Sequence, residues 1–404
     1  MIRTAFTRGK VATALALGTA LALTGCAASD DTGSSTGDGG SDKVVRIGYI
    51  GPLSGGSASL GVPSKNAMEL AVAHVNESGD LGFTLELITV DDEADAAKSS
   101  TAAQRMVTED GVVLVVGGPN SAPVKANNAI ITGAGVPNVI SIAQSDNLVD
   151  PANPGYDLTY RVTENNSYDV GAIVSLFVAG DYDNICMVAD TTEYGQNGIA
   201  ATESVFAANG LTLGGTAQHD ANAADLMPQV LQLRDAKCDA VYLYTLGQDA
   251  ALFMKTVNQV GWEVPVIGAR ALAQQAFISI AGKDGDGIIF PSVIDPGKKA
   301  AQDFIAAYDA EFGADSDPAH VFSSVAYDTI QMVAAALKAS NGEGGEALVK
   351  ALQSVEIEGV SGRDGSKLSW SADKHEAPGE DYLTFWTIKD GKYEFYSSDV
   401  ESGR

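Results

Sequence analysis

Histidine, cysteine and basic side chains are all scarce in this chain of 404 residues. Its four histidines do not recur at the short spacing of helical metal ligands, and there is no phosphate-binding Gly-x-x-x-x-Gly-Lys-Ser/Thr loop. No Gly-x-Ser-x-Gly turn is followed by the acid and histidine that a hydrolase needs. These absences predict a protein that is not an enzyme and that uses neither a cofactor nor a metal ion.

The shortage of basic residues leaves the chain strongly negative. Against 52 aspartates and glutamates there are 25 lysines and arginines, which gives a net charge of −27 at pH 7. A protein that binds nucleic acid must neutralise phosphates with basic side chains, so this balance excludes nucleic acid as a partner. An anionic membrane surface would repel the chain as well, and solubility is the simplest role of the charge.

Long apolar runs are also lacking. The run at residues 11–23 is shorter than the roughly 20 residues that span a bilayer as a helix. Three basic residues and no acidic ones precede it, which is typical of a secretory signal. It ends in LTGC at residues 23–26, which resembles the lipobox of bacterial lipoproteins. The alternative is an ordinary secretory signal followed by a chance cysteine.

The lipobox resemblance implies a processed and anchored chain. The signal, residues 1–25, would be removed, and Cys26 would carry a lipid whose two acyl chains suffice for stable anchoring. Because that segment holds three basic and no acidic residues, its loss would change the net charge from −27 to −30. Residues 26–43, which are small and mostly polar, are expected to form a flexible tether. We therefore expect an exported protein on the outer face of the cell membrane, held by its lipid alone.

Two further cysteines, Cys186 and Cys238, stand near predicted strands. Cys186 lies within the strand expected at residues 184–189, and Cys238 immediately precedes the one expected at 240–245. An exported chain sits where disulfides form. Free cysteine is equally common as a small buried hydrophobe, so a disulfide and two buried thiols both remain open.

Strands and helices alternate along most of the chain. Short apolar runs suited to buried strands are separated by segments with helical spacing of apolar residues. The strands of a first series are expected at residues 44–50, 84–90, 112–116 and 137–141, and those of a second at 184–189, 211–217, 240–245 and 264–268. Such alternation predicts an α/β protein with two doubly wound, parallel-sheet lobes.

Several segments together resemble the branched-chain amino-acid receptor family of ABC importers. These are IGYIGPLSGGSASLG, VDDEADAAKS, VVLVVGGPNSAP, GVPNVIS, DTTEYGQNG and VFSSVAYDTIQMVAAAL, in that order. The resemblance implies a type I periplasmic binding protein, with two lobes joined by a hinge of three crossings. One lobe would comprise residues 44–162 and 292–381, and the other residues 163–291 and 382–404. The late helices would pack on the first lobe and a final hairpin, turning at residues 390–391, on the second.

The same resemblance implies partners. A small-molecule ligand would be captured between the lobes of a monomer and delivered to an ABC permease and its ATPase subunits. The alternative is a lipoprotein of the same fold that senses a solute and signals through a membrane partner, which would share the site.

Ligands of open parallel sheets bind beyond the carboxyl ends of the strands. In the first lobe this rule selects Asn120 and Ser121, at the start of a helix whose free amides suit a carboxylate. In the family the matching serine holds the ligand carboxylate, and the loop with Ala143, Gln144 and Ser145 directs a carbonyl and a hydroxyl at the ligand. Helix capping and a polar surface loop are the plain alternatives.

Second-lobe candidates follow from the same rule and the same resemblance. Asp190 and Leu246 come directly after strands, and a helix cap is the plain alternative for Asp190. Tyr194 matches a family tyrosine that closes over the ligand. Phe322 matches a family phenylalanine that lines the apolar part of the pocket, and the plain alternative is that Phe322 is a core residue.

Arg270 departs from the family pattern. Amino-acid receptors of the family have a glutamate here, which pairs with the ligand ammonium, whereas an arginine binds a carboxylate or a carbonyl. Leu60 also replaces an aromatic residue that is common in the first loop. The expected ligand is an organic acid, an aromatic acid among the candidates, or a neutral amide-like solute. The alternative is a salt bridge of Arg270 outside the cleft.

Overall fold

The computed structural model describes residues 43–398 of the chain. Cys26, the predicted signal and all but the last residue of the predicted tether lie outside the described residues. The described strands form two large sheets, of five and seven strands, and a small one of two strands, β11 (Glu356–Ile357) and β12 (Leu368–Ser369). None of the helices in this part of the chain is long and apolar enough to span a bilayer.

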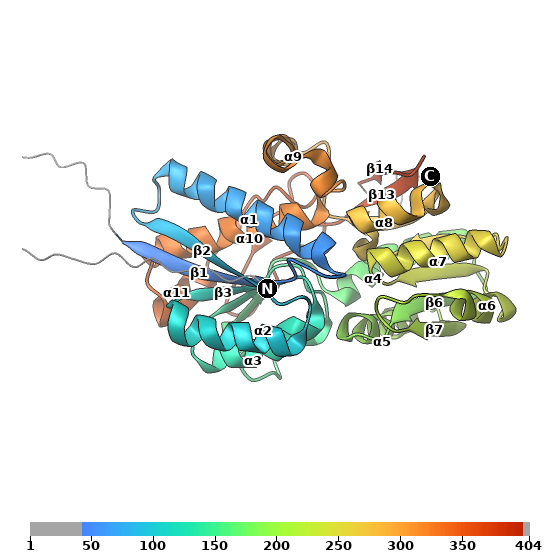
Figure 1. Cartoon of the computed structure of the whole chain (residues 1–404), viewed down its shortest axis with the longest axis horizontal. Helices are drawn as coiled ribbons and strands as arrows, with labels where there is room; N and C mark the ends of the chain where they lie inside the picture. Colours follow the sequence, from blue (N-terminus) through green and yellow to red (C-terminus); the bar gives the residue numbers. More distant parts are fainter. Residues whose placement is uncertain (1–42, 399–404) are drawn as a thin grey trace, which may run out of the picture. The chain divides into compact units, whose positions relative to one another are not determined.

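The five-stranded sheet and the helices around it are called the first lobe. Its elements are β1 (Val44–Gly51), α1 (Ala58–Ser78), β2 (Thr84–Asp91), α2 (Ala96–Arg105), β3 (Leu114–Gly117), α3 (Ser121–Gly133), β4 (Asn138–Ile140), β5 (Thr159–Arg161), α9 (Lys299–Phe312), α10 (Val321–Ala339) and α11 (Gly345–Leu352). The strands are parallel and run in the order β2-β1-β3-β4-β5. Figure 1 shows α1 and α10 together on one face of this sheet and α2 and α3 on the other.

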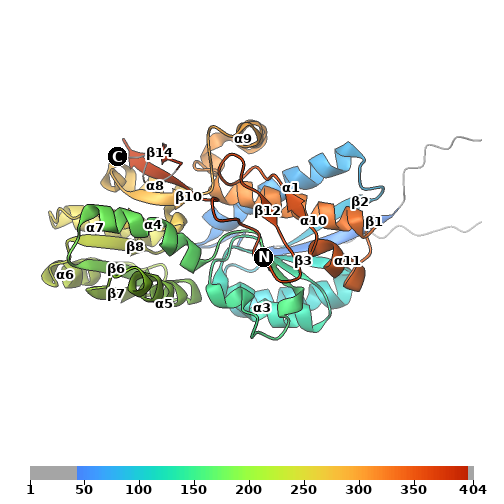
Figure 2. The ribbon, with the colours of Figure 1, turned by 180° about the vertical axis from the view of Figure 1, so that it is seen from behind.

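The seven-stranded sheet and its helices are called the second lobe. Its elements are α4 (Asn166–Gly180), β6 (Ile185–Asp190), α5 (Glu193–Ala208), β7 (Gly215–His219), α6 (Met227–Asp235), β8 (Ala240–Tyr244), α7 (Gly247–Gln259), β9 (Val266–Gly268), α8 (Gln275–Ala281), β10 (Ile289–Ser292), β13 (Thr384–Lys389) and β14 (Lys392–Ser397). Five strands are parallel, and the antiparallel hairpin β13–β14 extends one edge of the sheet, where the chain ends (Figure 2).

This arrangement confirms the predicted fold class. The chain passes between the two sheets three times, after β5, after β10 and before β13. The helices α10 and α1 pack together in the first lobe, and the final hairpin belongs to the second, as expected. Strands β6 and β8 are buried along their whole length, because helices cover both faces of a doubly wound sheet.

The start of one expected strand was wrong. The strand predicted at residues 211–217 begins only at Gly215, because the residues before it still return from α5, with Leu211 N–H donating to Phe206 O.

Helix α2 ends at Arg105 and continues as one π-helical turn, Met106–Asp110. It begins after Asp95, because the carboxylate of Asp95 accepts hydrogen bonds from the first free amides of α2.

The two cysteines of the second lobe form a disulfide. Strands β6 and β8 are parallel neighbours with Ile185 opposite Ala240, so Cys186 and Cys238 lie side by side at the amino-terminal ends of these strands. Their Cα atoms are 5.7 Å apart, and the bond joins residues separated by 52 positions. Of the two alternatives for these cysteines, the structure therefore has the disulfide.

Candidate ligand-binding site

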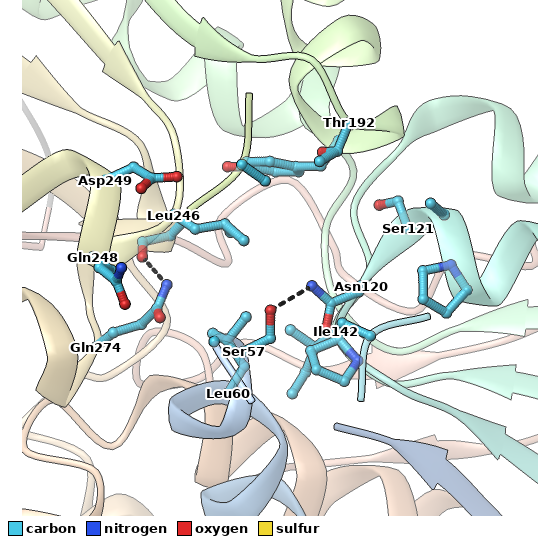
Figure 3. A pocket seen from close by; sticks show the side chains of 18 of the residues that line it. Ser57, Leu60, Asn120, Ser121, Ile142, Thr192, Leu246, Gln248, Asp249 and Gln274 are labelled. Atoms are coloured by element: carbon cyan, nitrogen blue, oxygen red, sulfur yellow. Dashed lines mark hydrogen bonds between the residues drawn. The ribbon is translucent and has the colours of Figure 1, made fainter. Parts of the chain in front are cut away.

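A cavity of about 190 Å³ lies at the carboxyl ends of strands from both lobes. In Figure 3 residues from the first lobe, such as Ser57 and Asn120, lie on one side of it, and Leu246 and Gln274 from the second lie on the other. The volume corresponds to roughly six water molecules at ~30 Å³ each, and it is below the ~300 Å³ at which pockets for drug-sized molecules begin. A cavity of this size suits a small solute.

Most of the residues selected from the sequence line this cavity. The structure brings together seven of the ten: Asn120, Ser121, Gln144, Tyr194, Leu246, Arg270 and Phe322. They come from the segments that follow β3, β4, β6, β8 and β9 and from the first turn of α10, and their role in binding a ligand stays a prediction.

Three of the ten do not line the cavity, which corrects the prediction. Asp190 accepts hydrogen bonds from the backbone and hydroxyl of Thr192, so its carboxylate stabilises the turn into α5 instead. The carbonyls of Ala143 and Ser145 accept from Arg161 Nη1, at 3.4 and 2.8 Å.

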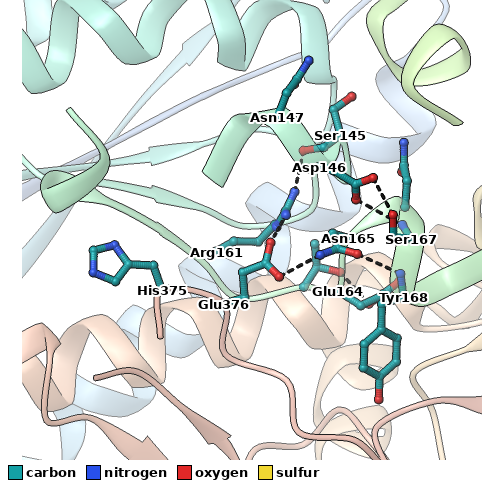
Figure 4. Close-up of polar contacts among 12 residues, drawn as sticks. Ser145, Asp146, Asn147, Arg161, Glu164, Asn165, Ser167, Tyr168, His375 and Glu376 are labelled. Atoms are coloured by element: carbon teal, nitrogen blue, oxygen red, sulfur yellow. Dashed lines mark hydrogen bonds and ion pairs between the residues drawn. The ribbon is translucent and has the colours of Figure 1, made fainter. Parts of the chain in front are cut away.

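Arg161 is itself anchored at the first crossing. Figure 4 shows its guanidinium between the Ser145 backbone and the carboxylate of Glu376, which also accepts from Asn165 Nδ2 at 2.8 Å. This network holds the backbone of the loop after β4 and uses the Ala143 carbonyl. The hydroxyl of Ser145 donates instead to Glu193 O of the second lobe, at 3.2 Å.

The first-lobe wall is the start of α3. Asn120 precedes the helix and its Nδ2 donates to Ser57 Oγ at 3.2 Å, a bond drawn in Figure 3, while its Oδ1 is buried without a partner among the described residues. Ser121 is the first residue of α3, and its Oγ accepts from Ser145 N–H at 3.4 Å. Neither side chain caps the helix. The amino-terminal end of α3 therefore presents free amides and a positive dipole to the cavity.

The second-lobe wall contains Arg270, which is 1 % exposed and follows β9. Its Nε lies 2.5 Å from Glu164 Oε1, an ion pair whose angle does not suit a hydrogen bond. Its Nη2 donates to Ile142 O at 3.4 Å, and its guanidinium carbon stands 5.6 Å from the centre of the Phe322 ring. Nη1 is buried and has no hydrogen-bond partner among the described residues.

These contacts decide between the two alternatives for Arg270. It does form a salt bridge, but the bridge lies at the wall of the cavity and not outside the cleft. Its partner, Glu164, was not selected from the sequence. Glu164 stands in the crossing between β5 and α4, where no strand end marks it, and it also accepts from Gln144 Nε2 at 2.9 Å.

Other cavity residues were missed because they are not at strand ends. Ser57 stands at the start of α1, and Gln274 follows a short 3-10 turn after β9. Gln274 Oε1 accepts from Ser59 Oγ at 3.0 Å, a contact between the two lobes. Only the folded chain brings these segments to the same cavity.

Burial changes the acidity of the groups around Arg270. Desolvation, with a smaller contribution from the charge of Glu164, raises the pKa of Asp169 to about 8. Desolvation also raises the pKa of Tyr194, which stacks on Tyr244 with ring centres 4.6 Å apart and has an unpartnered hydroxyl within the described part of the chain. At neutral pH both groups are thus protonated hydrogen-bonding groups.

The two lobes also touch beside the cavity. Glu193, in the first turn of α5, accepts hydrogen bonds from Lys125 Nζ of α3 at 2.8 Å and from Asn147 Nδ2 at 2.6 Å. Asp146 N–H donates to Asn197 Oδ1 at 2.8 Å. Because one partner of each contact belongs to each lobe, these bonds depend on how close the lobes are.

Comparison with known proteins identifies the family. A family model described as periplasmic binding protein matches residues 44–392. The Leu/Ile/Val-binding protein homolog 3 of Brucella melitensis biotype 1 is 26% identical over 321 residues, which cover 76% of this chain and 83% of the relative.

Solved structures agree on the fold. A type 1 periplasmic binding protein from Bordetella pertussis Tohama I superposes with a TM-score of 0.81 at 22% identity, covering 88% of this chain and 100% of that one. A solute-binding protein of an ABC transporter from Rhodopseudomonas palustris BisB5, in complex with 3,4-dihydroxybenzoic acid, superposes with a TM-score of 0.76 at 20% identity. The superposition covers 89% of this chain and 99% of that one. The chain therefore belongs to the periplasmic binding protein family, non-enzymatic extracytoplasmic solute binders that include the branched-chain amino-acid receptors of ABC importers.

Proposed function

We propose that this protein captures a small carboxylic acid between its lobes and delivers it to an ABC import permease. The observation that carries the proposal is Arg270, a buried guanidinium at the cavity wall whose Nη1 has no acceptor among the described residues. A carboxylate is the usual partner of such a group. The start of α3, with Asn120 and Ser121, faces the same cavity and favours an anion as well.

An α-amino acid fits this cavity less well, because no free carboxylate lines it to pair with the ligand ammonium. Two acidic residues line the cavity, and both carboxylates are engaged. Asp249 accepts hydrogen bonds from the backbone amides of Asn222 and Ala223, and Glu93 pairs with Lys98 at 2.6 Å. A ligand with one acid group and no ammonium meets the available partners better.

The rest of the ligand is expected to be apolar and flat. Phe322, Leu60, Ile142 and Leu246 supply an apolar lining. The related solute-binding protein from Rhodopseudomonas palustris BisB5 holds 3,4-dihydroxybenzoic acid, which supports an aromatic acid as the first candidate. The names of the curated relatives support leucine, isoleucine or valine instead, so the two classes have to be compared directly.

A thermal-shift and calorimetric panel makes this comparison. We expect benzoate, 4-methoxybenzoate or 3,4-dihydroxybenzoate to stabilise the protein by about 2.7 kcal/mol at a ligand concentration of about 100 Kd. The matching amides serve as controls for the acid group and should bind less tightly. Stabilisation by leucine or valine, with no effect of the acids, would contradict the proposal.

The contacts between the lobes provide a further prediction. Glu193→Gln should weaken the bond to Lys125 and thereby the closed arrangement, so affinity for every ligand should fall about two- to fivefold, the range of an exposed ion pair. Glu69→Gln, which removes an ion pair with Lys65 within α1, is the matched control and should leave the Kd unchanged. A ligand-dependent effect of Glu193→Gln would instead indicate direct contact with the ligand.

Anchoring and mechanics complete the proposal. A lipid on Cys26 would keep the receptor beside its permease as a monomer, and the lobes would comprise residues 44–162 with 292–381 and residues 163–291 with 382–404. Mass spectrometry of the membrane-extracted protein tests the lipid.

Solute sensing through a membrane signalling partner is the second candidate function, and growth on the ligand as a sole carbon source distinguishes uptake from sensing.

A further inference from the structure

Arg270 is paired with one buried carboxyl group, Glu164, and interacts electrostatically with a second, Asp169, although one suffices to balance its charge. Glu164 lies 2.5 Å from the guanidinium Nε. Asp169, in the first turn of α4, is 0 % exposed, and neither of its carboxyl oxygens has a hydrogen-bond partner among the described residues. With both acids ionised, the three groups would carry an uncompensated negative charge beside the cavity. Burying such a charge is costly, so the set retains a proton.

The contacts assign that proton to Asp169. Glu164 pairs with Arg270 and accepts hydrogen bonds from Gln144 Nε2 and Thr163 Oγ1, at 2.9 and 2.8 Å. The donors nearest to Asp169 are the Arg270 backbone amide and the Gln144 side chain, and neither reaches hydrogen-bond geometry in the described part of the chain. Burial, followed by the charge of Glu164, outweighs them and raises the pKa of Asp169 to about 8. At neutral pH the three groups together are therefore uncharged.

We propose that Asp169 is a specificity-determining residue that sets which charge the cavity accepts. When Asp169 carries its proton, Arg270 can donate from Nη1 to a ligand carboxylate without a competing negative charge. When Asp169 is ionised, the wall of the cavity is negative and repels that carboxylate. The inference rests on the proposed function, because it concerns an acid bound at Arg270.

The same balance limits the ligand to one negative charge. A monocarboxylate adds one negative charge, which Arg270 Nη1 and the free amides at the start of α3 can stabilise. A second carboxylate would find no further cation among the residues that line the cavity. We therefore expect monocarboxylates to bind and matched dicarboxylates, such as phthalate beside benzoate, to be rejected.

Other groups that face Asp169 do not titrate in the same range. Tyr194 of α5 and Tyr242 and Tyr244 of β8 interact electrostatically with it, and burial raises the pKa of each of them well above its ordinary value. Strand β10, which packs on α4, contributes no titratable side chain. With Glu164 and Arg270 paired to each other, a change in binding near pH 8 that depends on Asp169 can be attributed to it.

Calorimetry of wild type and Asp169→Asn between about pH 6.5 and about pH 9.5 tests the inference. The probe is benzoate, or 3,4-dihydroxybenzoate if benzoate does not bind. For the wild type the Kd should rise by about tenfold per pH unit above pH 8, with proton uptake that is visible as a difference between two buffers of unlike ionisation enthalpy. In Asp169→Asn, where a neutral amide replaces the carboxyl, both effects should disappear.

The outcomes separate this inference from the proposed function. Acid binding with the same pH dependence in both variants overturns the role of Asp169 and leaves the proposed function intact. Failure of every acid to bind at any pH overturns the proposed function, and the inference that rests on it as well. Tighter binding at high pH in the wild type would mean that the ligand brings a positive charge to Asp169, which also overturns the inference.

Discussion

Replacing Arg270 with glutamine should abolish acid binding, with a loss in affinity of at least about 100-fold. A buried, charge-assisted hydrogen bond to a carboxylate contributes about 2–5 kcal/mol when one partner is removed. Glutamine keeps polar hydrogen atoms at the wall of the cavity but removes the charge that the ligand needs. Isothermal titration with the acids of the panel measures the effect.

Arg270→Gln alone would change the stability of the fold as well as the affinity for the ligand, because Glu164 would lose its ion-pair partner. Leaving a buried charge unpaired costs about 3–5 kcal/mol, so Arg270→Gln alone should unfold at a clearly lower urea concentration. The double variant Arg270→Gln/Glu164→Gln removes both charges and should recover most of that stability, yet it should still fail to bind acids. If the double variant bound acids as well as the wild type, Arg270 would have no role in recognition.

A matched pair of side chains serves as the control. Arg161 is also a fully buried arginine paired with a glutamate, Glu376, but it lies outside the cavity lining. Glu376→Gln therefore weakens a buried ion pair while Arg161 keeps its bonds to the carbonyls of Ala143 and Ser145, and this variant should retain acid binding. Loss of binding in this variant as well would indicate a general effect of weakening buried ion pairs.

Removal of the disulfide should give the second large effect. In the chain-entropy description, a bond that closes a loop of 52 residues stabilises the folded state by about 4 kcal/mol. Cys186→Ala/Cys238→Ala should accordingly lower the urea midpoint of the second lobe markedly. Both cysteines lie at the amino-terminal ends of their strands, away from the cavity, so the Kd for the ligand should not change.

Reductant provides the control for this prediction. Dithiothreitol should lower the midpoint of the wild type toward that of the alanine variant and should leave the variant itself unchanged. Equal midpoints for oxidised wild type and variant would show that the bond contributes nothing measurable to the stability of the second lobe.

Much of the architecture could be predicted from local patterns. Buried strands of parallel sheets are short apolar runs, and the alternation of such runs with amphipathic helices determined both lobes, most strand positions and the final hairpin. Ser121, Leu246 and Arg270, which follow strands, lie at the cavity, and their role in binding stays a prediction. The architecture could be predicted because each strand–loop–helix unit depends on residues that are close together in the sequence.

Contacts between distant segments could not be predicted in this way. Asp190 satisfies the strand-end rule as well as Arg270 does, yet its carboxylate is used by Thr192, and the carbonyls of Ala143 and Ser145 are used by Arg161. The choice between disulfide and free thiols for Cys186 likewise depended on β6 and β8 being neighbours. Each outcome is a matter of which groups meet in space.

The sequence by itself determined the fold class, the family and the unusual arginine at position 270. Only the tertiary structure decided how that arginine is used, because Glu164 and Asp169, from the first crossing and α4, meet it only when the chain folds. The charge of a buried site is the sum over all groups that share it, and those groups need not be near one another in the sequence. That sum is the physical reason why the presence of Arg270 could be read from the sequence and the neutrality of its surroundings could not.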